Sequence, residues 1–403
     1  MRYLGNKRHL LGDIEAAARS LGFTKGTVCD LFAGSARVGR HFRALGSKVV
    51  ATDLMHSSYV LQQAHLELDG PPSFDTLLRE VETPEPLGDD SIGHALPADP
   101  ESWLPTRRVL AHLLALPPRE GLLTRQYSPA GSMDRRYLRP ENAAQADAIL
   151  ATLREWRERE WIASPEFALL LATTIDAVDR VANISGTYGA FLKKWQANAE
   201  QPLRLKLPAL VEGPVGEAHR EDALEWIGGV TADLLYMDPP YNQRQYPANY
   251  HLLEVIARIP TEPDLSSFED SIYGKTGLVP WRDKASVLCS RRGTECRDAF
   301  WEILRRTTIP RVVVSYSEEG IISRDEFEEM LAEYAGVSRA RLGHVLTEIP
   351  YKRFRSDADG RVSSIGTSRQ YKELPGRGRN EVHEWLFSVA KRADVSVGST
   401  EGA

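Results

Sequence analysis

A strand, a glycine-containing turn, a helix and a second strand follow one another early in the chain, and this run constrains the fold more than any other feature. Residues 27–32 have the apolar pattern of a buried strand, and residues 36–45 are typical of a helix that stops at Gly46. Residues 48–52 form a second apolar run, which ends at Asp53. Because a helical crossover joins parallel strands, the run predicts a βαβ unit of an α/β fold, with a ligand site beyond the carboxyl ends of its strands.

The rest of the chain predicts a discontinuous arrangement. The same patterns predict helices at 143–157, 165–181, 296–306 and 323–334, and strands at 232–237 and 311–316. Residues 70–140 are rich in Pro, Gly and Arg and lack a parallel-sheet pattern. We therefore predict one α/β domain, residues 1–64 and 206–390, interrupted by a mainly helical insertion at 65–205. The polar tail at 391–403 is expected to be disordered.

Composition places the chain among ordinary globular proteins, with 403 residues, 42% of them apolar and 26% charged. No run of about 18 uncharged apolar residues is present, so no membrane span is expected. Cys29, Cys289 and Cys296 lack the spacing of a zinc site and fit free thiols in a reducing compartment. The N-terminus carries Lys7, Arg8 and Asp13 among short apolar patches, which does not fit a signal peptide. We expect a cytoplasmic protein that holds no metal.

The turn within residues 30–39 is a candidate ligand site. Gly34 follows the first strand and precedes the helix, where a small residue lets a ligand approach the backbone and free N–H groups. Ala36 replaces the second glycine of a dinucleotide fingerprint, so the turn alone is equally compatible with a structural role. Asp53 lies 19 residues after Gly34, where a carboxylate can accept the hydroxyls of a ribose or serve as a loop or capping acid. Turn and acid together favour an adenosine-containing ligand.

The most informative segment follows the predicted strand at 232–237 and reads Asp238-Pro239-Pro240-Tyr241. The two prolines have fixed φ angles and lack N–H donors, so the turn is stiff and its carbonyls remain free to accept. The Asp238 carboxylate and the Pro239 carbonyl could bind both hydrogens of a planar amino group and disperse the positive charge that develops on its nitrogen during attack. Tyr241 could stack on a base rotated out of a duplex. The alternative is a proline turn that ends a buried strand.

Together these segments resemble a known family. The acidic Pro-Pro-Tyr motif and the Phe32-Ala33-Gly34 turn are similar to motifs of the S-adenosylmethionine-dependent amino-group DNA methyltransferases. The run Tyr3-Leu4-Gly5-Asn6-Lys7 resembles the N-terminal motif of their D12, or alpha, class. The motif order is also that of the class, with the insertion in the target-recognition position. Residues 242–253, which continue the acidic motif, resemble the FokI-type adenine methylases of restriction-modification systems.

This resemblance implies a Rossmann-like methyltransferase core and a role for each matching residue. Asp238 and the Pro239 carbonyl would hold the target amino group, in a turn that Pro240 completes. Tyr241 would stack on the base. The cofactor pocket would be formed by the N-terminal motif, the glycine turn and the strand-end acids, namely Tyr3, Lys7, Asp30, Phe32, Ala33, Gly34 and Asp53. Asp222 would face the adenine of the cofactor, the alternative being that it caps a short helix.

Two cationic segments are candidates for DNA contact. The net charge of −6 alone argues weakly against nucleic-acid binding, but clustering of cations matters more than their sum. Residues 183–195, which contain Tyr188, Lys193 and Lys194, resemble a segment of the FokI-type relatives. They could contact phosphate or a flipped base, or they could begin an amphipathic helix with solvated lysines.

The second segment lies near the end of the chain. Residues 351–355, with Lys352, Arg353 and Arg355, alternate basic and aromatic side chains, and residues 369–379 continue in a Gly/Ser-rich stretch. This pattern favours a flexible loop on DNA phosphate over a merely solvated surface.

The predicted activity is site-specific transfer of a methyl group from S-adenosylmethionine to adenine N6 in duplex DNA, by base flipping. Cytosine N4 is the lesser option, because enzymes of that kind usually carry Ser in place of Asp238. The resemblance implies a restriction-modification system with a cognate restriction endonuclease. The alternatives are methylation of RNA bases, methylation of a protein glutamine (where Asn usually replaces Asp238) and a DNA-binding module without catalysis.

Overall fold

The computed structural model describes residues 7–88, 91, 99–342, 346–352 and 381–392, and one seven-stranded sheet forms its centre. The strands are β1 (Thr27–Asp30), β2 (Lys48–Thr52), β3 (Glu217–His219), β4 (Leu234–Met237), β5 (Arg311–Ser317), β6 (Leu346–Lys352) and β7 (Glu381–Ala390). Their order is β3-β2-β1-β4-β5-β7-β6. The first five strands of this order are parallel, whereas β7 is antiparallel to both of its neighbours. The predicted α/β fold class is confirmed.

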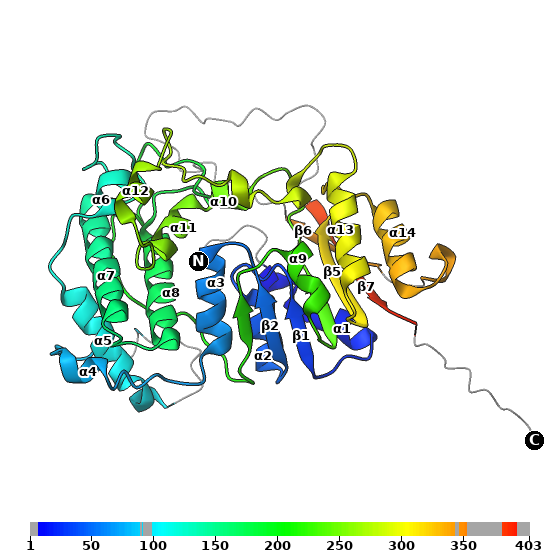
Figure 1. Cartoon of the computed structure of the whole chain (residues 1–403), viewed down its shortest axis with the longest axis horizontal. Helices are drawn as coiled ribbons and strands as arrows, with labels where there is room; N and C mark the ends of the chain where they lie inside the picture. Colours follow the sequence, from blue (N-terminus) through cyan, green and yellow to red (C-terminus); the bar gives the residue numbers. More distant parts are fainter. Residues whose placement is uncertain (1–6, 89–90, 92–98, 343–345, 353–380, 393–403) are drawn as a thin grey trace, which may run out of the picture.

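Helices surround this sheet and extend beyond one end of it (Figure 1). They are α1 (Leu11–Ser20), α2 (Arg37–Ala44), α3 (His56–Gln62), α4 (Leu77–Glu80), α5 (Leu104–Ala115), α6 (Leu122–Tyr127), α7 (Pro140–Glu158), α8 (Ser164–Val181), α9 (Ala223–Trp226), α10 (Tyr246–Asn249), α11 (His251–Arg258), α12 (Leu265–Asp270), α13 (Glu295–Arg306) and α14 (Arg324–Ala335). The βαβ unit and the four other predicted helices are confirmed.

Local signals explain where the long helices begin and end. Proline occupies the first turn of α7 and α8, at Pro140 and Pro165, where its missing N–H costs nothing. At the start of α14, Ser323 and Glu326 form a reciprocal capping box. The same helix ends at Gly336, whose φ of 68° is readily adopted only by glycine.

Both faces of the sheet are covered, because side chains alternate along each strand. Val28 of β1 belongs to a hydrophobic cluster with Ile14 of α1 and Phe42 of α2. The next residue, Cys29, belongs to the cluster on the opposite face, with Phe300 of α13 and Phe327 of α14. The parallel strands are therefore buried on both sides, and only their ends are free to form a site.

A third hydrophobic cluster joins the helices beside the sheet, from α3 through α5–α8 (Figure 1). It contains Leu150 of α7, and also Leu252 of α11 and Phe268 of α12, which follow the acidic motif in sequence. The helical part is thus built from two separate stretches of chain. The division into a core of 1–64 and 206–390 and an insertion at 65–205 stays a prediction. Within the described ranges, no helix has the length and apolar character needed to cross a membrane.

Candidate active site

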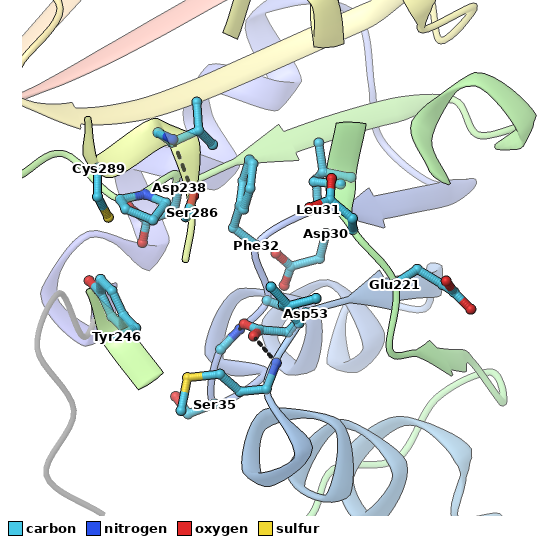
Figure 2. A pocket seen from close by; sticks show the side chains of 18 of the residues that line it. Asp30, Leu31, Phe32, Ser35, Asp53, Glu221, Asp238, Tyr246, Ser286 and Cys289 are labelled. Atoms are coloured by element: carbon cyan, nitrogen blue, oxygen red, sulfur yellow. Dashed lines mark hydrogen bonds between the residues drawn. The ribbon is translucent and has the colours of Figure 1, made fainter. Parts of the chain in front are cut away.

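A pocket with about 1120 Å³ of empty space, its open mouth included, lies beyond the carboxyl ends of β1, β2 and β4. Figure 2 shows Asp30 and Asp53 on one side of it, Asp238 and Tyr246 on the other, and Phe32 between them. Three separate strands therefore bring the predicted turn and the predicted acidic motif to one cavity. Of the predicted residues, the pocket is lined by Lys7, Asp30, Phe32, Ala33, Gly34, Asp53, Asp222, Asp238 and Pro240.

The glycine turn is held by the acid at the end of β2. The backbone N–H of Gly34 donates to Asp53 Oδ2 at 3.0 Å, and that of Met55 donates to Oδ1 at 3.0 Å. Gly34 has a φ of 50°, and Ala36 adopts the same left-handed region with a φ of 55°. For alanine this conformation costs about 1 kcal/mol, so the position is one where glycine would be natural. The turn nevertheless keeps its shape with Ala36 present.

Asp30 is the most deeply buried acid of the pocket, with 1% of its surface exposed. Its Oδ2 accepts from the Gly39 N–H at 3.0 Å, while Oδ1 has no hydrogen-bond partner among the described residues. Burial raises the pKa of Asp30 to about 7 and that of Asp53 to about 6. Ionising either Asp30 or Asp53 costs free energy when no ligand is bound, and Asp30 Oδ1 is without a partner in the described part of the chain. A ligand with a cationic group and hydroxyl donors would fit these two acids.

Asp238 pairs with the cation of the N-terminal motif. Lys7 Nζ lies 3.0 Å from Asp238 Oδ1 and 2.7 Å from Glu384 Oε1. Burial alone would lower the pKa of Lys7, but the two carboxylates together raise it above its ordinary value. Burial, opposed by the charge of Lys7, raises the pKa of Asp238 to about 6. The predicted catalytic acid therefore keeps its proton to a higher pH than an exposed aspartate does.

Pro239 and Tyr241 of the acidic motif lie away from the pocket lining. Pro239 is buried, and Tyr241 packs edge-on against Tyr316 with ring centroids 6.4 Å apart. Neither belongs to the set of described residues that line the pocket. The aromatic ring on that wall is Tyr246 (Figure 2). Stacking by Tyr241 and a contact from the Pro239 carbonyl stay predictions.

Sequence reasoning missed the far wall of the pocket, which consists of Tyr246, Pro247, Lys284, Ser286, Val287, Leu288 and Cys289. Gln245 joins the two stretches of this wall. Its Nε2 donates to the Ser286 carbonyl at 3.1 Å, and its Oε1 accepts from the Ser286 N–H at 2.9 Å. Tyr246 could have been suspected from its place just after the motif, but residues 284–289 carry no recognisable pattern.

Asp222 caps a short helix, and its contact with the adenine of a cofactor stays a prediction. Its Oδ1 accepts from the Leu224 N–H at 2.8 Å and so caps α9, while the residue also lines the pocket. Its carboxylate is exposed.

The predicted DNA-contacting residues fall into three groups. Tyr188 is fully buried, with its hydroxyl donating to Asp179 at 2.7 Å, so the expectation that its side chain reaches DNA is corrected. Lys193 and Lys194 are exposed on a non-helical segment, which corrects the alternative of a helix start. The Lys193 carbonyl accepts from Arg136 Nη1 at 3.1 Å, so a third cation lies beside them.

The remaining predictions concern residues that the structure describes only in part or not at all. Lys352 ends β6, and its side chain is not described. Tyr3, Arg353, Arg355 and residues 369–379 lie outside the described residues, as does the tail from 393. Across the residues that the structure does describe, no group of three or more His, Cys, Asp or Glu side chains is arranged to hold a metal ion.

The fold is α/β, with a pocket at the carboxyl ends of its parallel strands, and comparison with known proteins identifies the class of the chain. The family model described as D12 class N6 adenine-specific DNA methyltransferase matches residues 3–272, and the chain belongs to this family. The predicted resemblance is therefore confirmed. No solved structure is similar enough to the chain to count as a match.

The chain is similar to named members of restriction-modification systems. It is 33% identical to type II methyltransferase M.FokI of Planomicrobium okeanokoites over 97% of this chain and 53% of that protein. It is 31% identical to type II methyltransferase M.NlaIII of Neisseria lactamica over 89% of this chain and 93% of that protein. M.CviAII of Paramecium bursaria Chlorella virus 1 is 28% identical over 96% and 97%. The chain thus spans about half the length of M.FokI but nearly all of the other two.

Proposed function

We propose that the chain is a site-specific DNA adenine-N6 methyltransferase that uses S-adenosylmethionine and serves as the modification enzyme of a type II restriction-modification system. The observation that carries the proposal is the single pocket in which Asp238, at the end of β4, faces the turn and acids at the ends of β1 and β2. Membership of the D12 class supports the reaction, and the names of the relatives support the restriction-modification setting.

The acids nearest the glycine turn would hold the cofactor. Asp53 would accept the ribose hydroxyls, and the free Oδ1 of Asp30 would accept from the ammonium of the methionine part. Both acids have raised pKa values, so a cationic, hydrogen-donating ligand would favour their ionised forms. When bound, S-adenosylmethionine supplies an electrophilic methyl group on sulfur. Asp222, at the start of α9, would face its adenine.

Asp238 would act on the nitrogen that receives the methyl group. Lys7 occupies its Oδ1, so Oδ2 is the oxygen left for an N–H of the adenine amino group. The Pro239 carbonyl would accept the second N–H, and together the two acceptors would stabilise the positive charge that develops on N6. The sulfonium is already activated, so placing the two reactants side by side supplies much of the remaining rate gain.

DNA would approach along the wall that carries α10. The backbone N–H of Tyr188 donates to the Asn249 carbonyl at 2.9 Å, which ties the 183–195 segment to the helix that begins with Tyr246. Lys193 and Lys194 are exposed on this segment and beside Arg136, so they are suited to phosphate. Lys352, Arg353 and Arg355 would contribute further phosphate contacts. In a cell, this modification would protect cytoplasmic DNA from a cognate restriction endonuclease.

The test is incubation of the full chain with methyl-labelled S-adenosylmethionine and, separately, unmethylated bacteriophage λ DNA, total RNA and total protein. We expect label in DNA alone, as N6-methyladenine on nucleoside analysis. Asp238→Asn should slow transfer by about 1000-fold while leaving cofactor binding within twofold, because it removes a charge that acts on the developing cation. Asp283→Asn, at an exposed acid next to pocket residue Lys284, is the matched control.

Label in RNA or protein instead of DNA would reject the proposal in favour of the corresponding alternative. DNA binding without any transfer would favour the non-catalytic module.

A further inference from the structure

Lys7 joins two carboxylates that come from widely separated parts of the chain. Its Nζ lies 3.0 Å from Asp238 Oδ1 and 2.7 Å from Glu384 Oε1. Lys7 is 5% exposed and Glu384 3% exposed, whereas the Asp238 side chain is 20% exposed, so the cation and one of its two acids are buried and the other acid is partly open. A buried cation between two acids is costly to assemble and leaves one negative charge in excess. Its position beside the proposed catalytic acid indicates a role in the reaction.

The sheet itself fixes Glu384. The residue lies on β7, opposite Ser317 of β5 in the antiparallel register. Its Oε1 accepts a hydrogen bond from the hydroxyl of Ser315, which is fully buried on the same strand β5. Glu384 is thus held by a neighbouring strand, and it holds in turn the ammonium of Lys7.

We propose that Glu384 is a positioning residue that holds Lys7 against Asp238 Oδ1 and so leaves Asp238 Oδ2 directed at the substrate's amino group. The inference rests on the proposed role of Asp238. Glu384 also pairs with Lys7, so the ion pair between Lys7 and Asp238 is weaker. The Asp238 carboxylate can then accept more readily from the N–H donors of the base. No motif of the sequence pointed to Glu384.

The charges around Asp238 indicate the direction of the effect. Lys7 of the short N-terminal turn (Lys7–His9) lowers its pKa, whereas burial and Glu384 of β7 raise it. Asp30 at the end of β1 and Tyr236 of β4 also interact electrostatically with Asp238. Because Glu384 is one of the two groups that act most directly on Asp238, its replacement by a neutral residue should lower the pH at which Asp238 titrates.

The experiment compares wild type with Glu384→Gln, which keeps the shape and removes the charge. Two readouts are taken on the full chain. Carbon-13 NMR of labelled aspartate carboxyls, assigned with Asp238→Asn, follows the titration of Asp238. Single-turnover transfer from labelled S-adenosylmethionine to unmethylated λ DNA follows the acid limb of the rate profile. Glu348→Gln, at a half-exposed acid on the adjacent strand β6, is the matched control.

For Glu384→Gln we expect both midpoints to fall by about one pH unit. The plateau rate should also fall on the order of tenfold, because a neutral amide oxygen holds Lys7 less firmly than a carboxylate does. Lys7→Met should raise the NMR midpoint instead. If that variant does not fold, the double variant Lys7→Met/Glu384→Gln, which removes one charge of each sign, replaces it and should give a midpoint above that of Glu384→Gln.

Unchanged midpoints in Glu384→Gln, or equal changes in Glu348→Gln, would overturn the inference. A shifted NMR midpoint with an unshifted rate profile would show that Asp238 does not govern transfer and would overturn both the positioning role and the assignment of Asp238. Absence of transfer by the wild type would count against the proposed function alone, because the NMR comparison still decides whether Glu384 acts on Asp238.

Discussion

Gln245 and Ser286, 41 residues apart, are joined by two hydrogen bonds, in which the side-chain amide of Gln245 pairs with both main-chain groups of Ser286. This pairing imitates a strand contact and attaches residues 284–289 to the segment that follows the acidic motif. Ser286 and Tyr246, the neighbour of Gln245, both line the pocket (Figure 2). The wall opposite Asp30 and Asp53 is therefore held in part by this glutamine, together with the contact of Cys289 Sγ to the Arg244 carbonyl.

Replacing Gln245 by Ala should loosen this wall. We expect kcat/KM for methyl transfer to λ DNA to fall about tenfold, because the residues of this pocket wall are held less firmly. The free energy of unfolding should fall by about 1–2 kcal/mol, the usual worth of two hydrogen bonds. Steady-state kinetics and urea unfolding measure the two effects. Gln243→Ala, at an exposed neighbour, is the control and should change neither.

Stability should depend on pH through the buried acids. Asp30, Asp53 and Asp238 have pKa values of about 7, 6 and 6, all above the ordinary value of 3.8. Between pH 3.8 and these values the folded chain binds more protons than the unfolded chain. The contribution of these acids to the free energy of unfolding is therefore complete below their ordinary, unfolded-state pKa. It is lost as the pH rises through their pKa in the folded state. Half-buried His56 and buried His65 and His251 have lowered pKa values and act in the opposite direction below about pH 6.5, so the effect of the acids is read as a fall in Tm from pH 6.5 to pH 8 in the absence of cofactor.

Asp30→Asn should flatten this dependence. At pH 8 the free energy of unfolding of the variant should be higher by up to about 4 kcal/mol. The reason is that the folded chain no longer has to ionise a buried acid whose pKa is raised by roughly three units. Calorimetry across the pH range is the measurement, and exposed Asp13→Asn is the control. The same slope in wild type and in Asp30→Asn would contradict the burial of this acid.

Lys193 and Lys194 are predicted to contact phosphate. Replacing both by Ala should weaken DNA binding and reduce the slope of log K against log salt concentration by about two, since each phosphate contact contributes about 0.9. Fluorescence anisotropy with labelled λ fragments at several salt concentrations measures the slope. Lys25 is an exposed cation just before β1, at the amino ends of the parallel strands, and Lys25→Ala should leave the slope unchanged. A slope that responds equally to both changes would argue against a local contact.

Tyr188 is predicted to stabilise the fold and not to touch DNA. Tyr188→Phe deletes the hydroxyl that donates to Asp179 and leaves a buried carboxylate with one partner fewer. The free energy of unfolding should drop by about 1–3 kcal/mol, with DNA affinity unchanged. Chemical unfolding and anisotropy test this, with half-exposed Tyr273→Phe as the control. A loss of DNA affinity without a loss of stability would restore the original expectation.

Much of the core was predictable because its signals are local. The apolar run that ends at Asp30, the turn around Gly34 and the strand that ends before Asp53 follow from side-chain periodicity and glycine conformation alone. Parallel strands must place their carboxyl ends at one edge, so the meeting of Asp53 and Asp238 was also predictable in outline.

β6 and β7 were missed for the opposite reason. In β7, Glu384 is buried while His383 and Trp385 on either side are partly exposed, so polar and apolar residues do not alternate in the usual order. Its pairing with β5 depends on long-range register, which leaves no local pattern.

The sequence by itself determined the reaction class, because a stiff Asp-Pro-Pro-Tyr turn after a buried strand, a glycine turn and a strand-end acid are short segments whose chemistry is complete within a few residues. Tertiary structure alone decided which groups surround that chemistry. Lys7 meets Glu384 across 377 positions, Gln245 meets Ser286, and Tyr188 turns inward. Such contacts arise from the packing of distant elements, and no spacing along the chain records them.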